Sequence, residues 1–176
     1  TTAVSTPIGD GTGNQDLDSC ADQPAYDAST GKSYYVQITF DGEVHWALAS
    51  VNVSTGASTT VAEFLWENGE FPTLPRIDAI AIAPDGSLFI ADAGNDRLRV
   101  VSVDGLITSL ASGGALPAPL GVAVGADGQP LVIDFQRAQV LRVEVASGEV
   151  TAVAGDGGIA FGGDGGPAVA ARLAYP

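Results

Sequence analysis

The chain has 176 residues, of which 45% are apolar, and its 21 acidic residues against 7 basic ones give a formal net charge of −14. This charge argues against a nucleic-acid partner, because an acidic surface repels phosphate backbones. No run of eighteen apolar residues is present, so the sequence predicts no membrane-spanning helix and no membrane partner. The many Val, Ile and Thr residues, together with 23 glycines and 10 prolines, are typical of an all-β protein with many turns.

Residues 1–22 are rich in Thr, Gly, Asp and Asn, and we expect them to form an irregular N-terminal arm. They lack the basic start and apolar core of a signal peptide, which a processed chain would also lack. The compartment therefore stays open, with a secreted or extracellular location slightly favoured over a cytoplasmic one. Cys20 is the single cysteine, so the chain has no internal disulfide.

A first four-stranded unit is predicted over residues 23–72. Apolar residues alternate with polar ones along its strands, and short turns that contain glycine separate them. The predicted strands cover residues 25–27, 34–40, 45–53 and 58–66.

The second unit, residues 73–116, carries the clearest pattern. Its turns are Pro84-Asp85-Gly86, Gly94-Asn95-Asp96 and Asp104-Gly105. The alternation predicts a first strand around Ile80 and Ile82 and further strands over residues 88–92, 98–103 and 106–110.

A third unit is predicted over residues 117–155, because two landmarks of the second unit recur in it. Asp85 recurs as Asp127 and Asp92 as Asp134, both 42 positions later. Four strands repeated at this period are the mark of a β-propeller blade. We therefore expect an all-β propeller of four-stranded antiparallel blades, with three blades in this chain; a twelve-stranded β-sandwich is the structural alternative.

One stretch of the second unit resembles a known repeat. Residues 81–99, AIAPDGSLFIADAGNDRLR, are similar to the NHL repeat, whose usual form is close to GIAVD-x-DG-x-IYVADxGNxRI. In the third unit, Asp134-Phe135-Gln136-Arg137 replaces the Asp-x-Gly-Asn run. The glycine-rich end of the chain resembles the inter-blade loop of bacterial NHL proteins and of teneurin-type propellers. The resemblance covers residues 75–176 well and residues 23–72 poorly.

The resemblance implies a ring of six blades, so three blades would be half of it. Residues 156–176 are predicted to form a Gly-rich inter-blade loop and a short helix, Ala168–Leu173, that lead to a blade boundary at Pro176. Either the chain is a fragment of a longer propeller, natural or designed, or two copies complete one ring by two-fold symmetry. We expect self-association, with a second copy or with the missing blades.

Two aspartates end the second strand of successive units and mark a candidate ligand-binding set at the channel mouth. Asp92 is followed by Asn95 and Arg97, and Asp134 by Arg137. In the alternative interpretation each Asp accepts hydrogen bonds within its own turn. Repetition in successive units favours this structural role, because active sites seldom repeat.

Metal sites have little support in the sequence. Asp156 and Asp164 lie among glycines and are weak candidates for Ca²⁺, which takes six to eight oxygen ligands. Their spacing fits no known calcium loop, and no cofactor is required. His45 is the only histidine, so one chain builds neither a histidine-based triad nor a multi-histidine zinc site.

The function we expect is that of an NHL-like binding or scaffold module, because NHL-type propellers usually present one face to a protein partner. The alternative is a metal-dependent hydrolase or lactonase of the six-bladed propeller type, with a carboxylate site at the channel mouth. For that site the sequence offers Asp92, Asp134, Glu63 and Asp78 without a recognisable spacing, so the catalytic residues stay unknown.

Overall fold

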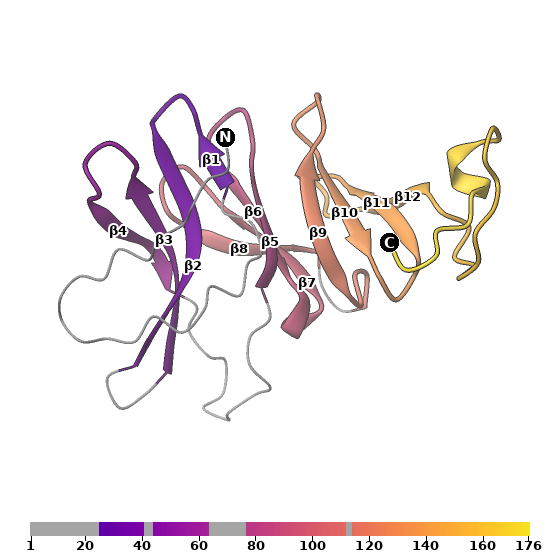
Figure 1. The fold of residues 1–176 in the computed structure, drawn as a ribbon, viewed down its shortest axis with the longest axis horizontal. Coiled ribbons are helices and arrows are strands. Elements are labelled where there is room, and N and C mark those ends of the chain that lie inside the picture. The colour runs from indigo at the N-terminus through magenta and orange to yellow at the C-terminus, as the bar shows by residue number, and fades with distance from the viewer. Residues whose placement is uncertain (1–24, 41–43, 64–76, 112–113) are drawn as a thin grey trace.

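Twelve strands form three four-stranded antiparallel sheets in the computed structural model of the chain, as Figure 1 shows. The structure describes residues 25–40, 44–63, 77–111 and 114–176. The predicted arm over residues 1–22, with Cys20, lies outside the described residues. No helix in the described ranges is long and apolar enough to cross a membrane.

The first sheet pairs its strands in chain order, as the alternation predicts. Its strands are β1 (Ala25–Asp27), β2 (Lys32–Phe40), β3 (Val44–Asn52) and β4 (Ser58–Glu63). The end of the predicted fourth strand, residues 64–66, falls outside the described residues.

The second sheet has the same topology. Its strands are β5 (Ile77–Ile82), β6 (Leu88–Asp92), β7 (Arg97–Val101) and β8 (Ile107–Ala111). The predicted third strand ran to Val103, which is wrong by two residues. The Ser102 N–H donates to the Leu106 carbonyl at 2.9 Å, and this bond closes the turn before Val103 is reached.

The third sheet repeats the order again. Its strands are β9 (Pro119–Val124), β10 (Pro130–Asp134), β11 (Gln139–Val143) and β12 (Val150–Ala154). Three separate sheets exclude the sandwich alternative, which needs two sheets packed face to face.

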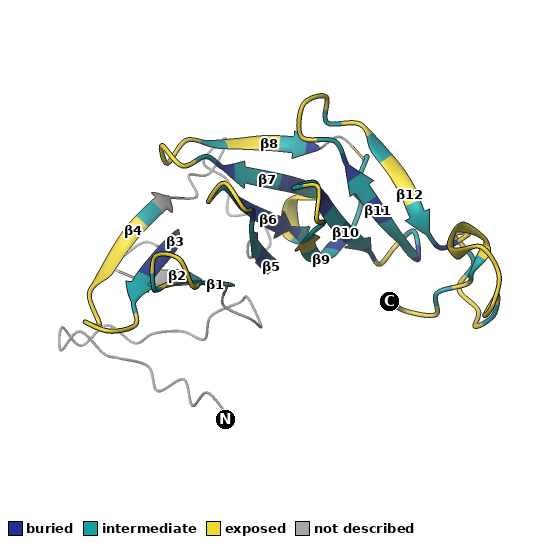
Figure 2. Cartoon of the chain, turned by 90° about the horizontal axis from the view of Figure 1, so that it is seen from above, coloured by how far each residue is buried: buried dark blue, intermediate teal, exposed yellow. Residues whose placement is uncertain are grey.

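The sheets are fanned around one side of the molecule. The first strand of each sheet lies on that inner side, where β5 contacts both β1 and β9, while β4, β8 and β12 lie on the outer side (Figure 2). This arrangement is that of consecutive propeller blades, with the innermost strands beside the ring axis.

The second sheet is buried on both faces. Alternate residues point to opposite faces of a strand, so one face packs on the first sheet and the other on the third. The first core cluster includes Val36, Leu48 and Ile90, and the second includes Phe89 and Leu141. The three sheets are therefore held together by apolar contacts between neighbouring sheets.

Close packing of neighbouring sheets also requires a glycine. Gly148, in the turn between β11 and β12, has a φ of +72°, and a Cβ there would lie 2.5 Å from the Leu110 carbonyl oxygen. Any side chain would push the turn away from β8 of the preceding sheet.

The C-terminal segment corrects one prediction. The expected helix over Ala168–Leu173 is a single 3-10 turn over Ala168–Ala170. It ends there because Ala171 is extended and the Arg172 N–H donates to the Gly162 carbonyl at 2.8 Å, in an antiparallel bridge. The segment attaches to the end of β12 through the Gly155 N–H, which donates to the Ala168 carbonyl at 3.0 Å.

Candidate functional site

The structure places the predicted ligand-binding residues in two separate turn networks, one in the second sheet and one in the third. Asp92 ends β6 and Asp134 ends β10, on the edge of the fan opposite the Asp-Gly turns. Both side chains are buried. The hydrogen bonds that each carboxylate accepts come from groups of its own blade.

Asp92 is enclosed by polar groups of its own turn. Its Oδ1 accepts a hydrogen bond from Asn95 Nδ2 at 2.7 Å, and its Oδ2 accepts one from Arg97 Nε at 2.8 Å. The Nη1 atom of Arg99 lies 4.0 Å from the same Oδ2. With both oxygens occupied and 1% of the residue exposed, Asp92 is built to hold a turn together.

Asp134 occupies the equivalent position with fewer partners. Its Oδ1 accepts the backbone N–H of Arg137 at 2.9 Å, and its buried Oδ2 accepts no hydrogen bond from the described residues. The guanidinium of Arg137 points away from it and donates to the carbonyls of Ala115 and Gly114 at 2.8 and 2.9 Å. Arg137 therefore fixes the connection between the second and third sheets.

The two calcium candidates behave differently from each other. Both oxygens of Asp156 accept hydrogen bonds, from the Gly158 N–H at 2.7 Å and from Arg172 Nε at 3.2 Å. Asp164 is exposed. Among the described residues, no group of three or more His, Cys, Asp or Glu side chains could hold a metal ion. The calcium site stays a prediction without a ligand set.

The Asp156 contacts predict a pH response. The Gly158 N–H, and after it Arg172, hold the pKa of this carboxyl below its ordinary value. A depressed carboxyl pKa stabilises the folded loop above the ordinary pKa, and this contribution is lost as pH falls through the folded-state pKa. The Gly158 amide resonance should follow that midpoint in an NMR titration. Arg172→Ala should raise the midpoint, and an unchanged midpoint would contradict the ion pair.

A groove opens on the other edge of the fan, which we call the upper edge because it lies at the top of Figure 1. It lies between the second and third sheets and has a volume of about 440 Å³. Its floor is apolar and formed by Ala83, Phe89 and Val100. The Asp-Gly turns of the two sheets form its walls.

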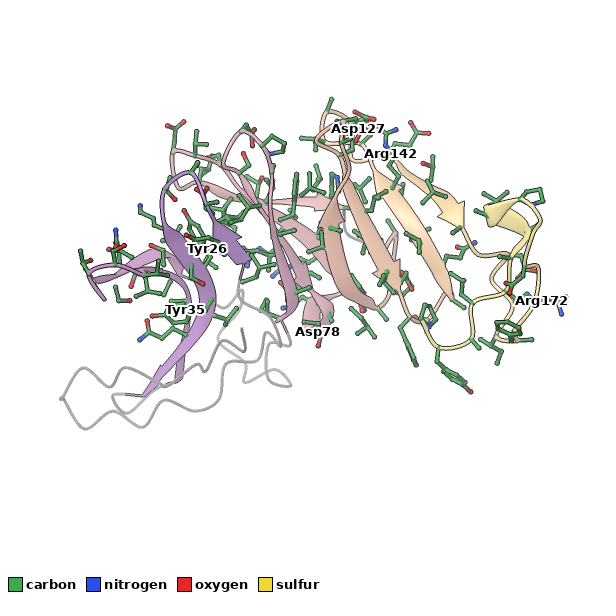
Figure 3. All side chains as sticks on the ribbon, turned by 45° about the horizontal axis from the view of Figure 1, so that its top comes forward. Tyr26, Tyr35, Asp78, Asp127, Arg142 and Arg172 are labelled. Atoms are coloured by element: carbon green, nitrogen blue, oxygen red, sulfur yellow. The ribbon has the colours of Figure 1, made fainter. Side chains whose placement is uncertain are left out.

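The walls of this groove are acidic. Asp85 Oδ1 accepts the Ser87 N–H at 2.9 Å, and Asp127 Oδ1 accepts the Gln129 N–H at 3.1 Å. The Oδ2 of Asp127 pairs with Arg142 Nη2 at 2.9 Å, a contact visible in Figure 3. Because each carboxylate keeps one oxygen in its turn, the backbone holds both acids in place beside the groove.

One feature of the sequence marks this groove, an aspartate that recurs in equivalent turns. Asp85 and Asp127 lie 42 positions apart and open equivalent turns. Equivalent turns of neighbouring blades lie on the same edge, so a repeated acid becomes a pair of acids across a groove. The backbone of His45 lies in β3, and its side chain is outside the described residues.

Comparisons with known proteins give the fold and no closer relationship. No protein-family model and no curated protein matches the chain. Solved structures do match. Virginiamycin B lyase from Staphylococcus aureus is 17% identical with a TM-score of 0.53, covering 79% of this chain and 44% of that one. A chain of the nidogen–laminin complex is 20% identical with a TM-score of 0.57, covering 74% and 46%.

A third match is TolB from Acinetobacter baumannii, 18% identical with a TM-score of 0.52, covering 75% of this chain and 31% of that one. These proteins are β-propellers, and the chain spans less than half the length of each. Together with the fanned sheets, they define the chain as a β-propeller protein with three four-stranded blades.

Proposed function

We propose that the chain is an NHL-like β-propeller interaction module whose three blades are completed by the three blades of a second copy. The observation that carries this proposal is the apolar face of the third sheet that points away from the second. A β-sheet with such a face is stable when another layer covers it.

The second sheet shows what that face looks like when it is covered. Phe89, Ala91 and Leu98 point toward the third sheet, and each is at most 2% exposed. The residues 42 positions later in the third sheet are Leu131, Ile133 and Val140. These three alternate with Val132 and Leu141, which are packed in the second core cluster, so they point to the opposite face.

The face formed by Leu131, Ile133 and Val140 belongs to neither core cluster, and all three side chains are only half-buried. Ile133 and Val140 are directly paired across β10 and β11. A patch of this kind exposes to water the positions that the preceding blade buries.

At the other end of the fan, the first sheet has a face that points away from the second sheet. Its residues include Tyr35 and Val51, which alternate with the packed Val36 and Leu48. The matched propeller chains of the lyase and of the nidogen–laminin complex are about twice as long as the aligned part of this chain, with 44% and 46% covered. Two copies joined by a two-fold axis would bring each open third sheet onto an open first sheet.

Native mass spectrometry and sedimentation velocity of the full chain test this proposal. We expect a dimer, and Ile133→Asp should convert it to a monomer because a charge would be buried in the interface. The matched control is Leu106→Asp, which places the same charge on an exposed turn and should leave the dimer intact. A monomeric wild-type chain would overturn the proposal. The same spectra report any bound divalent ion, which would instead favour the hydrolase alternative.

A further inference from the structure

We propose that the groove at the upper edge binds a lysine or arginine side chain from an extended segment of a partner protein. The groove lies between two blades of one chain, so this inference does not depend on how the ring closes. It goes beyond the interaction-module proposal by naming a site and the chemistry of its ligand.

The shape of the groove suits a long side chain with an apolar stem. Val100, which is half-buried, and Val145, which is exposed, offer carbon atoms to the methylene groups of lysine or arginine. Ala83 and Phe89 also line the groove but are buried. Lysine and arginine bury such stems on apolar surfaces while their charged heads stay near polar groups.

The negative charge of the groove lining favours a positively charged ligand. Asp85 forms no ion pair with the described residues, and its turn occupies one carboxylate oxygen. Arg142 lies outside the groove lining and contacts both Asp127 and Glu144, at 2.9 and 3.4 Å, so one guanidinium serves two carboxylates. Among the described residues that line the groove, two are acidic, Asp85 and Asp127, and none is basic. A ligand cation would reduce this excess of negative charge.

The surroundings of the groove suit an extended segment. Val103 and Val145 lie 42 positions apart, at equivalent places in the turns that end β7 and β11, and both are exposed. The turn after β7 also exposes Leu106, at 67%. Val145 lines the groove, and Val103 lies beside the Asp85-Gly86 turn on the same edge, because a Cβ on Gly86 would lie 3.5 Å from it. Apolar residues next to the bound cation would therefore find contacts on the turns.

The test follows amide shifts by NMR while a short peptide, acetyl-Val-Lys-Val-amide, is added to the full chain. The amides of Ser87 and Gln129 are direct reporters, because they donate to Asp85 and Asp127. We expect saturable shifts at these two amides and at Val145. The shifts should weaken as NaCl rises from about 0.05 M to about 0.5 M, because salt screens exposed charges.

Two peptides and two variants make the result decisive. Replacing the lysine by norleucine removes only the charge, and replacing it by glutamate reverses the charge; neither should shift the reporters. Asp85→Asn keeps the oxygen that accepts the Ser87 N–H and should weaken binding about five- to tenfold. Asp164→Asn is the matched control, an exposed acid of the C-terminal segment outside the groove lining, and should change binding less than about twofold.

Three outcomes would overturn the inference. Equal shifts with the norleucine peptide would show binding by apolar contacts alone. Equal weakening by both variants would show a response to overall charge and no site. The absence of saturable shifts at Ser87 and Gln129 would show that the groove does not take a basic side chain. None of these outcomes depends on whether the chain is a dimer.

Discussion

Replacing Asp92 by alanine is expected to lower the free energy of unfolding by about 3–5 kcal/mol, the usual loss when one partner of a buried ion pair is removed. The side chain of Asp92 is 2% exposed and that of Arg97 is 20% exposed. Without the carboxylate, Arg97 loses its 2.8 Å partner, and Asn95 loses the acceptor of its amide group. Urea unfolding followed by circular dichroism measures the loss.

The equivalent variant Asp134→Ala is the matched control. Asp134 is equally buried, but it accepts a single hydrogen bond, from the Arg137 N–H, and forms no ion pair with the described residues. We expect a smaller loss, about 1–2 kcal/mol, from the unsatisfied N–H of the turn. Equal losses for the two variants would show that the Arg97 pair adds nothing to stability and that both acids act through their turns alone.

The sequence was sufficient to predict the blades, because the strands of the second and third sheets are short apolar segments, alternating or continuous, bounded by turns. It was less accurate where hydrogen bonds outside the strand ladders decide an end. β7 stops at Val101 because the bond from Ser102 to Leu106 closes the turn. The C-terminal helix stops at Ala170 because residue 172 pairs with Gly162. The pattern of apolar residues reveals neither bond.

The candidate site was harder to predict than the fold. Asp92 and Asp134 share a position, but the residues that follow them differ: the places of Asn95 and Arg97 are taken by Arg137 and Gln139, 42 positions later. Only the structure shows that Arg137 turns toward the Gly114 carbonyl, so that the two turns have different chemistry. The groove could not be predicted from the sequence either. Its walls come from two blades, and its depth depends on how closely these blades pack.

The second large effect is expected at Phe89, whose replacement by alanine should lower the free energy of unfolding by about 3–5 kcal/mol. Its ring is 2% exposed and lies in the second core cluster, between the second and third sheets. The matched control is Phe135→Ala. Phe135 is 42% exposed and contacts one ring, that of Tyr175 at 6.0 Å between centroids, so its loss should stay below about 1 kcal/mol.

The Phe89 variant also tests whether the blades unfold together. In a stack of repeats, the total stability is the sum of the intrinsic stability of each repeat and of the interface energies between neighbouring repeats. Phe89 belongs to the second sheet but packs on Val132 and Leu141 of the third. If the contact couples the two blades, Phe89→Ala should speed hydrogen exchange at Leu141 as much as at Ile90. Faster exchange confined to the second sheet would show that each blade is stabilised mainly by its own hydrogen bonds. The third sheet would then stay folded without the contact from the preceding blade.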